Sequence, residues 1–134
     1  MRAGDGADGH RLPPDMLRQF VMPSGVAPNG IAAGPDGNLW FTEQDGALVG
    51  RIYPMGNVTP FSLPGSKPWD VTVGSDDNLW FTDRTDRIGR MTPSGTATEF
   101  NLPATGAGLW GIAAGPHGNL RFTELTGQIG VIIL

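Results

Sequence analysis

An all-β domain is the fold class that the sequence predicts, and three observations indicate it. A ten-residue motif, Gly-Pro-Asp-Gly-Asn-Leu-Trp-Phe-Thr-Glu at Gly34–Glu43, returns in variant form at Gly74–Asp83 and Gly115–Glu124, so its copies start 40 and then 41 residues apart. Each copy is a turn sequence followed by aromatic and branched residues, which favour strands. Beyond a short turn at residues 15–19, the chain shows no helical period. A fixed period of this size predicts an array of like units.

Each unit carries four short strand signals. In the first unit they are expected at residues 30–33, 39–42, 48–52 and 58–64, separated by turns rich in Gly, Pro, Asp and Asn. The prolines of the last segment suit a strand at the edge of a sheet. Four antiparallel strands in about 40 residues match one blade of a β-propeller. A β-sandwich would also show short strands, but it would not need the same motif at a fixed period.

The repeat divides the chain into an N-terminal arm and a partial propeller. Residues 1–19 have no hydrophobic period and are expected to form a flexible arm. The units then cover about 20–64, 65–103 and 104–134, and the last one stops within its third strand. Phe20-Val21-Met22-Pro23 matches the ends of the later fourth strands, so it is interpreted as the last strand of a preceding blade. Propellers typically have four to eight blades. An incomplete ring of about three leaves an open edge, so we expect missing blades or self-association to close it.

Composition excludes several classes of partner. The net charge is −4 with both signs interspersed, which argues against nucleic-acid binding. The chain has no cysteine, so a disulfide framework and a thiolate metal site are excluded. No apolar run approaches the roughly 18 residues of a membrane span, and the first twenty residues lack a signal-peptide core. A cytoplasmic protein with no membrane partner is the expectation.

Three carboxylates are candidate metal ligands. Glu43, Asp83 and Glu124 recur at the end of the aromatic strand in successive units. Carboxylates at equivalent places on adjacent blades could form a ring of oxygen ligands for a hard cation. The alternative is that each accepts hydrogen bonds from a neighbouring turn or pairs with an arginine, namely Arg51, Arg84 or Arg90. The aromatic pairs 40–41 and 80–81, by contrast, are predicted to pack between blades.

Ligand contacts are expected in the segments that enter each first strand, because these differ from unit to unit and would surround one mouth of the channel. The candidates are Asn29, Trp69, Asp70 and Trp110, with simple loop variation as the alternative. His10 is interpreted as a solvated histidine of the arm, and His117 as a hairpin residue. Arg121, which replaces the tryptophan of the motif, indicates a less buried flank.

The repeated motif, followed by Ile/Val-Gly-Arg and by Thr-Glu-Phe-Asn-Leu-Pro, resembles the virginiamycin B lyase (streptogramin lyase) family over residues 20–134. The resemblance implies a seven-bladed propeller. It also implies a Mg²⁺-dependent carbon–oxygen lyase that confers antibiotic resistance by linearising type B streptogramins through elimination at their ester linkage.

In that family a catalytic histidine lies two residues after a metal-binding glutamate, in the segment before a first strand. The matching segments here, Ala27–Asn29, Lys67–Trp69 and Gly108–Trp110, contain neither residue. The catalytic residues are therefore unknown from the sequence. The alternative function is a non-catalytic propeller module that binds a peptide, sugar or protein, or a truncated remnant.

Overall fold

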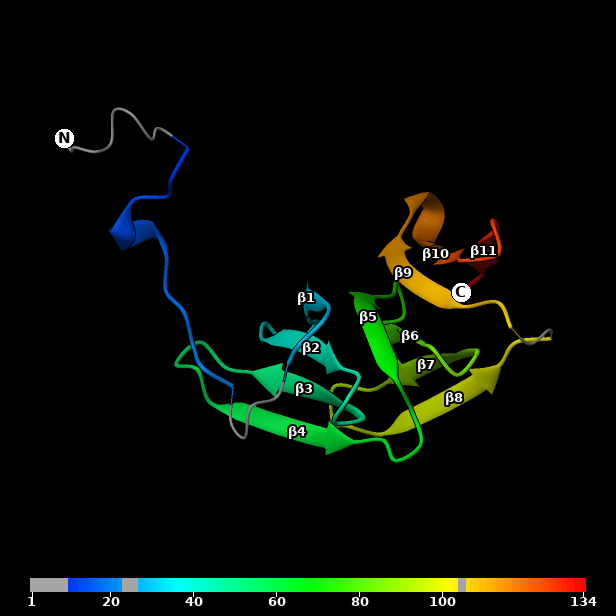
Figure 1. Ribbon diagram of the computed structural model, residues 1–134, viewed down its shortest axis with the longest axis horizontal. Helices are drawn as coiled ribbons and strands as arrows, with labels where there is room; N and C mark the ends of the chain where they lie inside the picture. Colours follow the sequence, from blue (N-terminus) through cyan, green and yellow to red (C-terminus); the bar gives the residue numbers. More distant parts are fainter. Residues whose placement is uncertain (1–9, 23–26, 104–105) are drawn as a thin grey trace.

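Three antiparallel sheets make up the fold of this computed structural model, which describes residues 10–22, 27–103 and 106–134. Their strand orders are β1-β2-β3-β4, β5-β6-β7-β8 and β9-β10-β11 (Figure 1). We call the sheets blade 1, blade 2 and blade 3. The strands are β1 (Ile31–Ala33), β2 (Leu39–Glu43), β3 (Leu48–Ile52), β4 (Val58–Ser62), β5 (Pro68–Val73), β6 (Leu79–Asp83), β7 (Arg87–Met91), β8 (Ala97–Asn101), β9 (Leu109–Ala114), β10 (Leu120–Glu124) and β11 (Ile129–Ile132).

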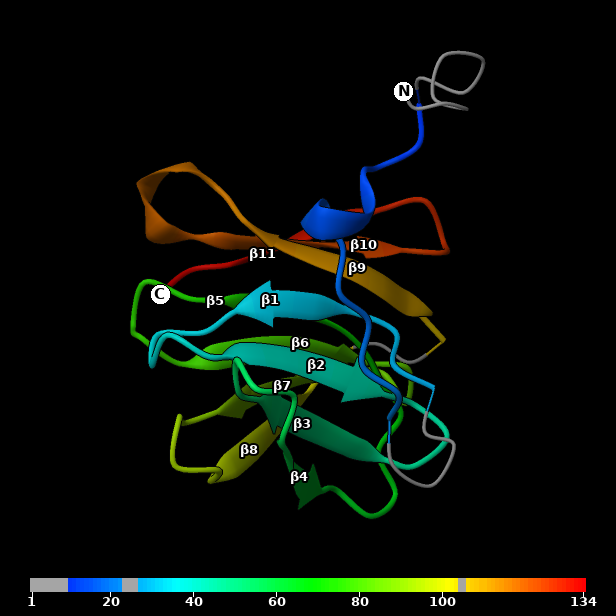
Figure 2. The same ribbon diagram turned by 90° about the vertical axis from the view of Figure 1, so that its left-hand side faces the viewer.

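The blades follow one another along an arc. The first strand of each blade, β1, β5 or β9, lies on the concave side, and β4 and β8 lie on the convex side (Figures 1 and 2). Consecutive inner strands contact each other directly. This all-β, propeller-like arrangement confirms the predicted fold class, including a third unit that reaches its third strand within the described residues.

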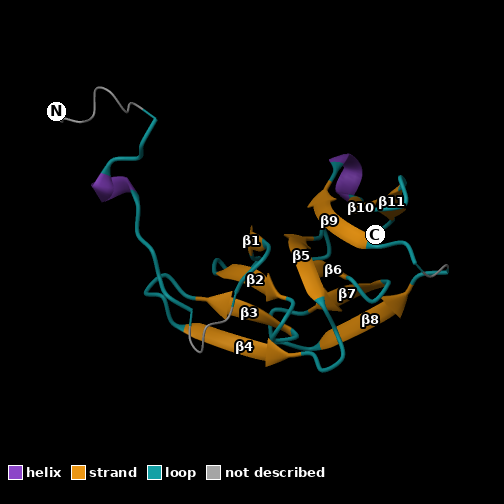
Figure 3. Cartoon of the chain, viewed as in Figure 1, coloured by secondary structure: helices purple, strands orange, loops and turns teal. Residues whose placement is uncertain are grey.

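Strands dominate the described residues, as the colouring in Figure 3 shows. The helical segments among them are single 3-10 turns, η2 (Pro14–Met16) and η4 (Pro116–Gly118). Neither is nearly long enough to cross a lipid bilayer. The first of these turns belongs to the predicted arm, whose residues 1–9 lie outside the described part of the chain, and residues 10–19 are exposed.

A hydrogen-bonded turn starts each aromatic strand. Asp36 accepts bonds from the Asn38 backbone N–H at 3.2 Å and from the Trp40 indole at 3.0 Å. Asp76 holds Asn78 and Trp80 in the same way in blade 2. The repeated Asp-x-Asn-x-Trp spacing therefore has a physical basis, because one carboxylate satisfies the turn and the buried indole together.

The Ile/Val-Gly-Arg segment requires a glycine because a phenylalanine ring of the neighbouring strand lies against it. The rings of Phe41 and Phe81 lie directly over Gly50 and Gly89, their cross-strand partners, and a Cβ on either glycine would overlap the ring. Blade 3 repeats the arrangement with Phe122 over Gly130. Only glycine leaves room for these rings, so the motif fixes the spacing between the second and third strands of each blade.

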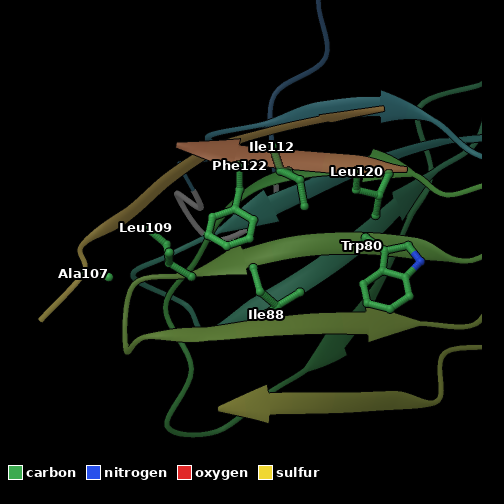
Figure 4. Close-up of a cluster of buried hydrophobic side chains, with 7 residues drawn as sticks. All are labelled: Trp80, Ile88, Ala107, Leu109, Ile112, Leu120 and Phe122. Atoms are coloured by element: carbon green, nitrogen blue, oxygen red, sulfur yellow. The ribbon is translucent and has the colours of Figure 1, made fainter. Parts of the chain in front are cut away.

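The core lies between blades. Trp40 is fully buried between blades 1 and 2, where it packs with Val71, Leu79, Phe81 and Met91. Between blades 2 and 3 the equivalent cluster joins Trp80 and Ile88 to residues of β9 and β10 (Figure 4). The predicted packing between blades is thus confirmed for Trp40, Trp80 and Phe81. Phe41 is buried over Gly50 of its own blade and belongs to neither cluster.

Arg121 departs from this pattern in blade 3. Its guanidinium lies over Gly115, where the indoles of the other blades lie over Gly34 and Gly74. The residue is half-buried, and its Nη1 atom is buried without a hydrogen-bond partner. This flank is less buried than its counterparts, as the substitution indicated.

Candidate functional site at the mouth of the inner strands

The start of each inner strand forms a common rim on the concave side. Trp69 and Asp70 lie in β5 and Trp110 in β9, whereas Asn29 precedes β1. The expectation that all four belong to connecting segments is therefore wrong for three of them. The register of β5 on β6 shifts between Pro68 and Val71, so a bulge carries Trp69 and Asp70 into the strand.

The two tryptophans of the rim contact each other and an arginine. The ring centroids of Trp69 and Trp110 are 4.6 Å apart, with the planes tilted by 38°. The Arg84 guanidinium lies 5.1 Å from the Trp69 ring and 4.5 Å from the Trp110 ring. Trp110 is 39% exposed and Trp69 is half-buried. We call Trp69, Trp110 and Arg84 the rim cluster, an aromatic surface that carries one positive charge.

Threonines of the aromatic strands position the rim backbone. The Thr42 hydroxyl donates to the Trp69 carbonyl oxygen at 2.6 Å, and the Thr82 hydroxyl donates to the Trp110 carbonyl oxygen at 2.7 Å. Each threonine also accepts a bond from the inner part of its own blade: Thr42 from Gly30 N–H, directly before β1, and Thr82 from Asp70 N–H in β5. Because both threonines are fully buried, these bonds fix one blade against the next without using the tryptophan side chains.

Asp70 and Asn29 have structural partners. One Asp70 oxygen accepts from Val71 N–H at 2.9 Å, and the other accepts from Ile112 N–H of blade 3 at 3.0 Å. The Asn29 side-chain oxygen accepts from Gln44 N–H at 3.2 Å. Of the four predicted contact residues, the structure brings Trp69 and Trp110 together, and it engages Asp70 and Asn29 in holding the rim.

The three predicted metal ligands do not gather. Among the described residues no group of three or more His, Asp or Glu side chains could hold a metal ion. Glu43 accepts from Gly46 N–H at 2.9 Å, and Asp83 accepts from the N–H groups of Lys67 and Thr85. These two carboxylates serve turns, as the alternative interpretation held. The predicted ring of three carboxylates is therefore not formed by the described residues.

Asp83 belongs instead to a polar network inside blade 2. Arg87 bridges Asp83 at 3.3 Å and Glu99 at 3.0 Å, and Glu99 also accepts from the Ser66 hydroxyl. Burial raises the pKa of Glu99, and its hydrogen bond with Asp83 raises that pKa further. Burial acts the same way on Asp83, but hydrogen bonds from Glu99, Thr85 and Lys67 outweigh it and lower the pKa of Asp83. The pKa values of the two carboxyls that flank Arg87 are thus shifted in opposite directions.

Neither histidine lies at the rim. His10 is exposed in the arm, and His117 is exposed in the turn between β9 and β10, at the opposite end of the inner strand from Trp110. The η4 turn gives His117 a φ of 63°. Both interpretations of the histidines as non-catalytic agree with these positions. The described rim therefore offers an aromatic, cationic surface without an imidazole base.

Sequence reasoning missed Arg84 as a rim residue and the role of the threonines. Arg84 directly follows the repeated motif, at the place held by Gln44 and Leu125. A comparison of that position across units would have marked it as variable, like the neighbouring rim positions. The inter-blade bonds of Thr42 and Thr82 left no such signal, because the threonine is the same in every unit.

Comparisons with known proteins agree with this architecture. The class is a β-propeller built from antiparallel blades. The Virginiamycin B lyase family matches residues 9–134, and the chain belongs to that family. A virginiamycin B lyase of Saccharopolyspora erythraea is 46% identical over 90 residues, which are 65% of this chain and 30% of the relative. One from Nocardia farcinica is 33% identical over 104 residues, which are 78% of this chain and 37% of the relative.

Solved structures show the same relationship. The virginiamycin B lyase of Staphylococcus aureus superposes with a TM-score of 0.75 at 36% identity, over 87% of this chain and 45% of that protein. A catalytically inactive histidine-to-alanine variant of that enzyme, solved with quinupristin, gives a TM-score of 0.76 at 37% identity. This chain thus spans less than half the length of these relatives.

Proposed function

We propose that these blades form the ligand-contacting part of a streptogramin lyase-type propeller, and that the rim cluster binds a type B streptogramin. The observation that carries the proposal is the contact of two partly exposed tryptophans with Arg84 on the concave side. Rigid aromatic rings and an arginine are the residue types that dominate binding energy at interfaces. A cyclic depsipeptide offers apolar side chains to the rings and carbonyl oxygens to the guanidinium.

The membership of the chain in the lyase family supports this choice of ligand. A relative of known structure was solved with quinupristin, which supplies the probe. Hydrogen bonds from the buried threonines hold the backbone of Trp69 and Trp110 in place before a ligand arrives. A rim cluster that is already ordered loses less conformational entropy on binding.

Elimination itself needs groups that the described residues do not offer. A base must remove a proton from carbon, the carbon–oxygen bond of the ester must break, and the leaving carboxylate must be stabilised. Arg84 could meet part of the last requirement through its charge. No histidine lies at the rim in the described part of the chain, and no three of its His, Asp or Glu side chains form a group that could hold a metal ion. We therefore propose that this chain binds the antibiotic without opening its ring, and that magnesium and the base require further blades.

Calorimetric titration with quinupristin tests the binding. We expect saturable binding by the wild-type chain and a loss of about tenfold in affinity for Trp110→Ala, which corresponds to roughly 1.4 kcal/mol. Arg84→Met keeps the aliphatic stem but removes the charge, and it should weaken binding several-fold. Phe100→Ala removes a partly exposed ring on the convex strand β8 and serves as the control. Absence of binding by the wild type, or equal affinity in all variants, would refute the proposal.

Chromatography of the same mixtures tests the catalytic part. With and without Mg²⁺, we expect the antibiotic to be recovered with its ring intact. A ring-opened dehydro product that accumulates with time and with protein concentration would show that the chain carries a base that the rim does not reveal.

A further inference from the structure

One residue, Asp86, holds both ends of the connection between blades 2 and 3. It directly precedes β7, and its carbonyl oxygen accepts from Leu102 N–H at 3.1 Å, where the connection leaves β8. Its carboxylate accepts from Gly106 N–H at 2.7 Å and from Gly108 N–H at 3.3 Å, directly before β9. Trp110 of the rim cluster follows two residues after Gly108. The aspartate therefore anchors the segment that leads to this tryptophan.

The other blades lack a carboxylate at this place. Ala47 holds it in blade 1 and Gly127 in blade 3, since each makes a backbone hydrogen bond of the same turn as Asp86 does. The φ angles of these three residues are all positive, at 52°, 95° and 68° respectively. Alanine and glycine thus form the turn without a side-chain acceptor. The Asp86 carboxylate therefore serves the connection rather than its own turn.

The connection that enters blade 3 is longer than the one that enters blade 2. Leu63 and Leu102 start the two connections in the same way, and Trp69 follows the first by six positions whereas Trp110 follows the second by eight. The longer connection also contains two glycines with positive φ. Length and glycine content both raise the conformational entropy that is lost when a segment becomes ordered. An additional anchor is therefore needed here to hold one conformation.

The anchor acts from one blade to the next. Trp69 and Arg84 belong to blade 2 and Trp110 belongs to blade 3, so the geometry of the rim cluster depends on contacts between these blades. The Thr82 hydroxyl fixes the Trp110 carbonyl oxygen. One fixed atom leaves the entering segment free to pivot around it, but a second bond, to the N–H of Gly108, also fixes the direction of the segment.

We propose that Asp86 is a positioning residue of the rim cluster, which sets the place of the Trp110 ring against the other two members. The consequence for ligand binding rests on the proposed function, whereas the placement of the ring does not. Without the anchor the ring would sample more positions, and its ordering would then cost affinity although no ligand-contacting group has changed.

Circular dichroism reports this placement without a ligand. Two indoles with ring centroids 4.6 Å apart couple their electronic transitions, and the resulting couplet is the signal that Trp110→Phe removes. We expect Asp86→Gly to reduce the couplet by about half, because glycine keeps the positive φ but offers no acceptor. Asp86→Asn keeps one acceptor oxygen and should retain most of the signal. Asp45→Gly, at an exposed position in the turn between β2 and β3, removes the same charge and is the matched control.

The Asp86→Gly chain should remain folded. Ala107 and Leu109 keep their places in the core cluster between blades 2 and 3 (Figure 4), and Gly127 already forms the equivalent turn in blade 3. A cooperative thermal transition checks this. A wild-type couplet in the folded Asp86→Gly chain, an equal loss in the Asp45→Gly chain, or an Asp86→Asn chain no better than Asp86→Gly would each overturn the proposal.

Calorimetric titration with quinupristin then tests the consequence for binding. We expect affinity to fall about fivefold in Asp86→Gly and to stay near that of the wild type in Asp45→Gly and Asp86→Asn. If the wild-type chain does not bind quinupristin, the proposed function fails, and the couplet still decides whether Asp86 positions the ring.

Discussion

The indole N–H of Trp80 donates to the carboxylate of Asp76, four residues earlier, over 3.0 Å. Asp76 is solvent-exposed while Trp80 is buried between blades. A surface charge thus satisfies the polar atom of a core side chain.

Replacement of Asp76 by alanine should destabilise the protein by about 1–3 kcal/mol, because the buried indole N–H would lose its partner. Urea unfolding followed by tryptophan fluorescence would measure this. Asp77→Ala is unsuitable as a control because Asp77 has a φ of 62°, so Asp77→Asn, which tolerates that conformation, is preferred. Equal stability of the alanine variant and the wild type would contradict the role assigned to this bond.

The same carboxylate should make stability depend on pH. Burial pushes the pKa of Asp76 upward, but hydrogen bonds from Trp80 and Asn78 outweigh it and lower the pKa below its usual 3.8. A lowered pKa in the folded state stabilises the protein above the unfolded value, and this stabilisation is lost as the pH falls through the folded pKa. Asp76→Asn should therefore flatten the stability profile between about pH 5 and pH 2. Acid titrations of both proteins would show whether the profiles differ.

Gly89→Ala should cost about 3 kcal/mol, since its new methyl group would overlap the Phe81 ring and force β6 and β7 apart. Gly111→Ala is a matched control, because a Cβ there meets only Thr123 and Asp70 at ordinary contact distances of 3.5 and 3.6 Å. Thermal unfolding should separate the two variants clearly. A Gly89→Ala chain as stable as the control would mean that the ring can move aside.

Thr82→Val should loosen blade 2 from blade 3. Valine preserves the shape but leaves the Trp110 carbonyl oxygen and the Asp70 N–H without their partner, at a cost of about 1–3 kcal/mol. Thr98→Val, at an exposed site on β8, should change stability by less than about 0.5 kcal/mol. Hydrogen exchange at the start of β9 should rise in the first variant alone.

Blade 3 should not accept the residue pair of the other blades in the same way. His117 has a φ of 63°, whereas neither Asp36 nor Asp76, at the same place in the motif, has a positive φ. Arg121→Trp with His117→Asp therefore restores the donor and the acceptor but not the turn geometry, and we expect a coupling below about 0.5 kcal/mol between the two substitutions. A double-mutant cycle on the unfolding free energy measures it, and a favourable coupling of about 1 kcal/mol would contradict this expectation.

Much of the fold could be predicted because the same turn-and-strand motif occurs three times in the sequence. The strands expected at residues 39–42 and 48–52 match β2 and β3. The hydrogen bond from the Trp40 indole to the Asp36 carboxylate accounts for the four-residue spacing of the aspartate and the tryptophan in the motif. Local chemistry decides these features, since turn residues and cross-strand partners lie close in the sequence.

The site was harder to predict because it depends on contacts between units. The bulge that draws Trp69 and Asp70 into β5 depends on pairing with β6, and the path of the Arg84 side chain depends on two rings from different blades. Glu43 and Asp83 looked like metal ligands because their recurrence suggested a ring. Their donors include backbone N–H groups of neighbouring turns, and a repeat pattern does not distinguish such donors from a cation.

The threonine bonds to the backbone of Trp69 and Trp110 have a consequence for how such a surface can change. The link between blades uses a carbonyl oxygen, which every amino acid possesses, so it is indifferent to the side chain displayed there. Positions 69 and 110 can therefore be varied without rebuilding the scaffold. A library randomised at these positions together with Arg84 should retain folded members at high frequency, which makes the concave face a starting point for selecting new binding specificities.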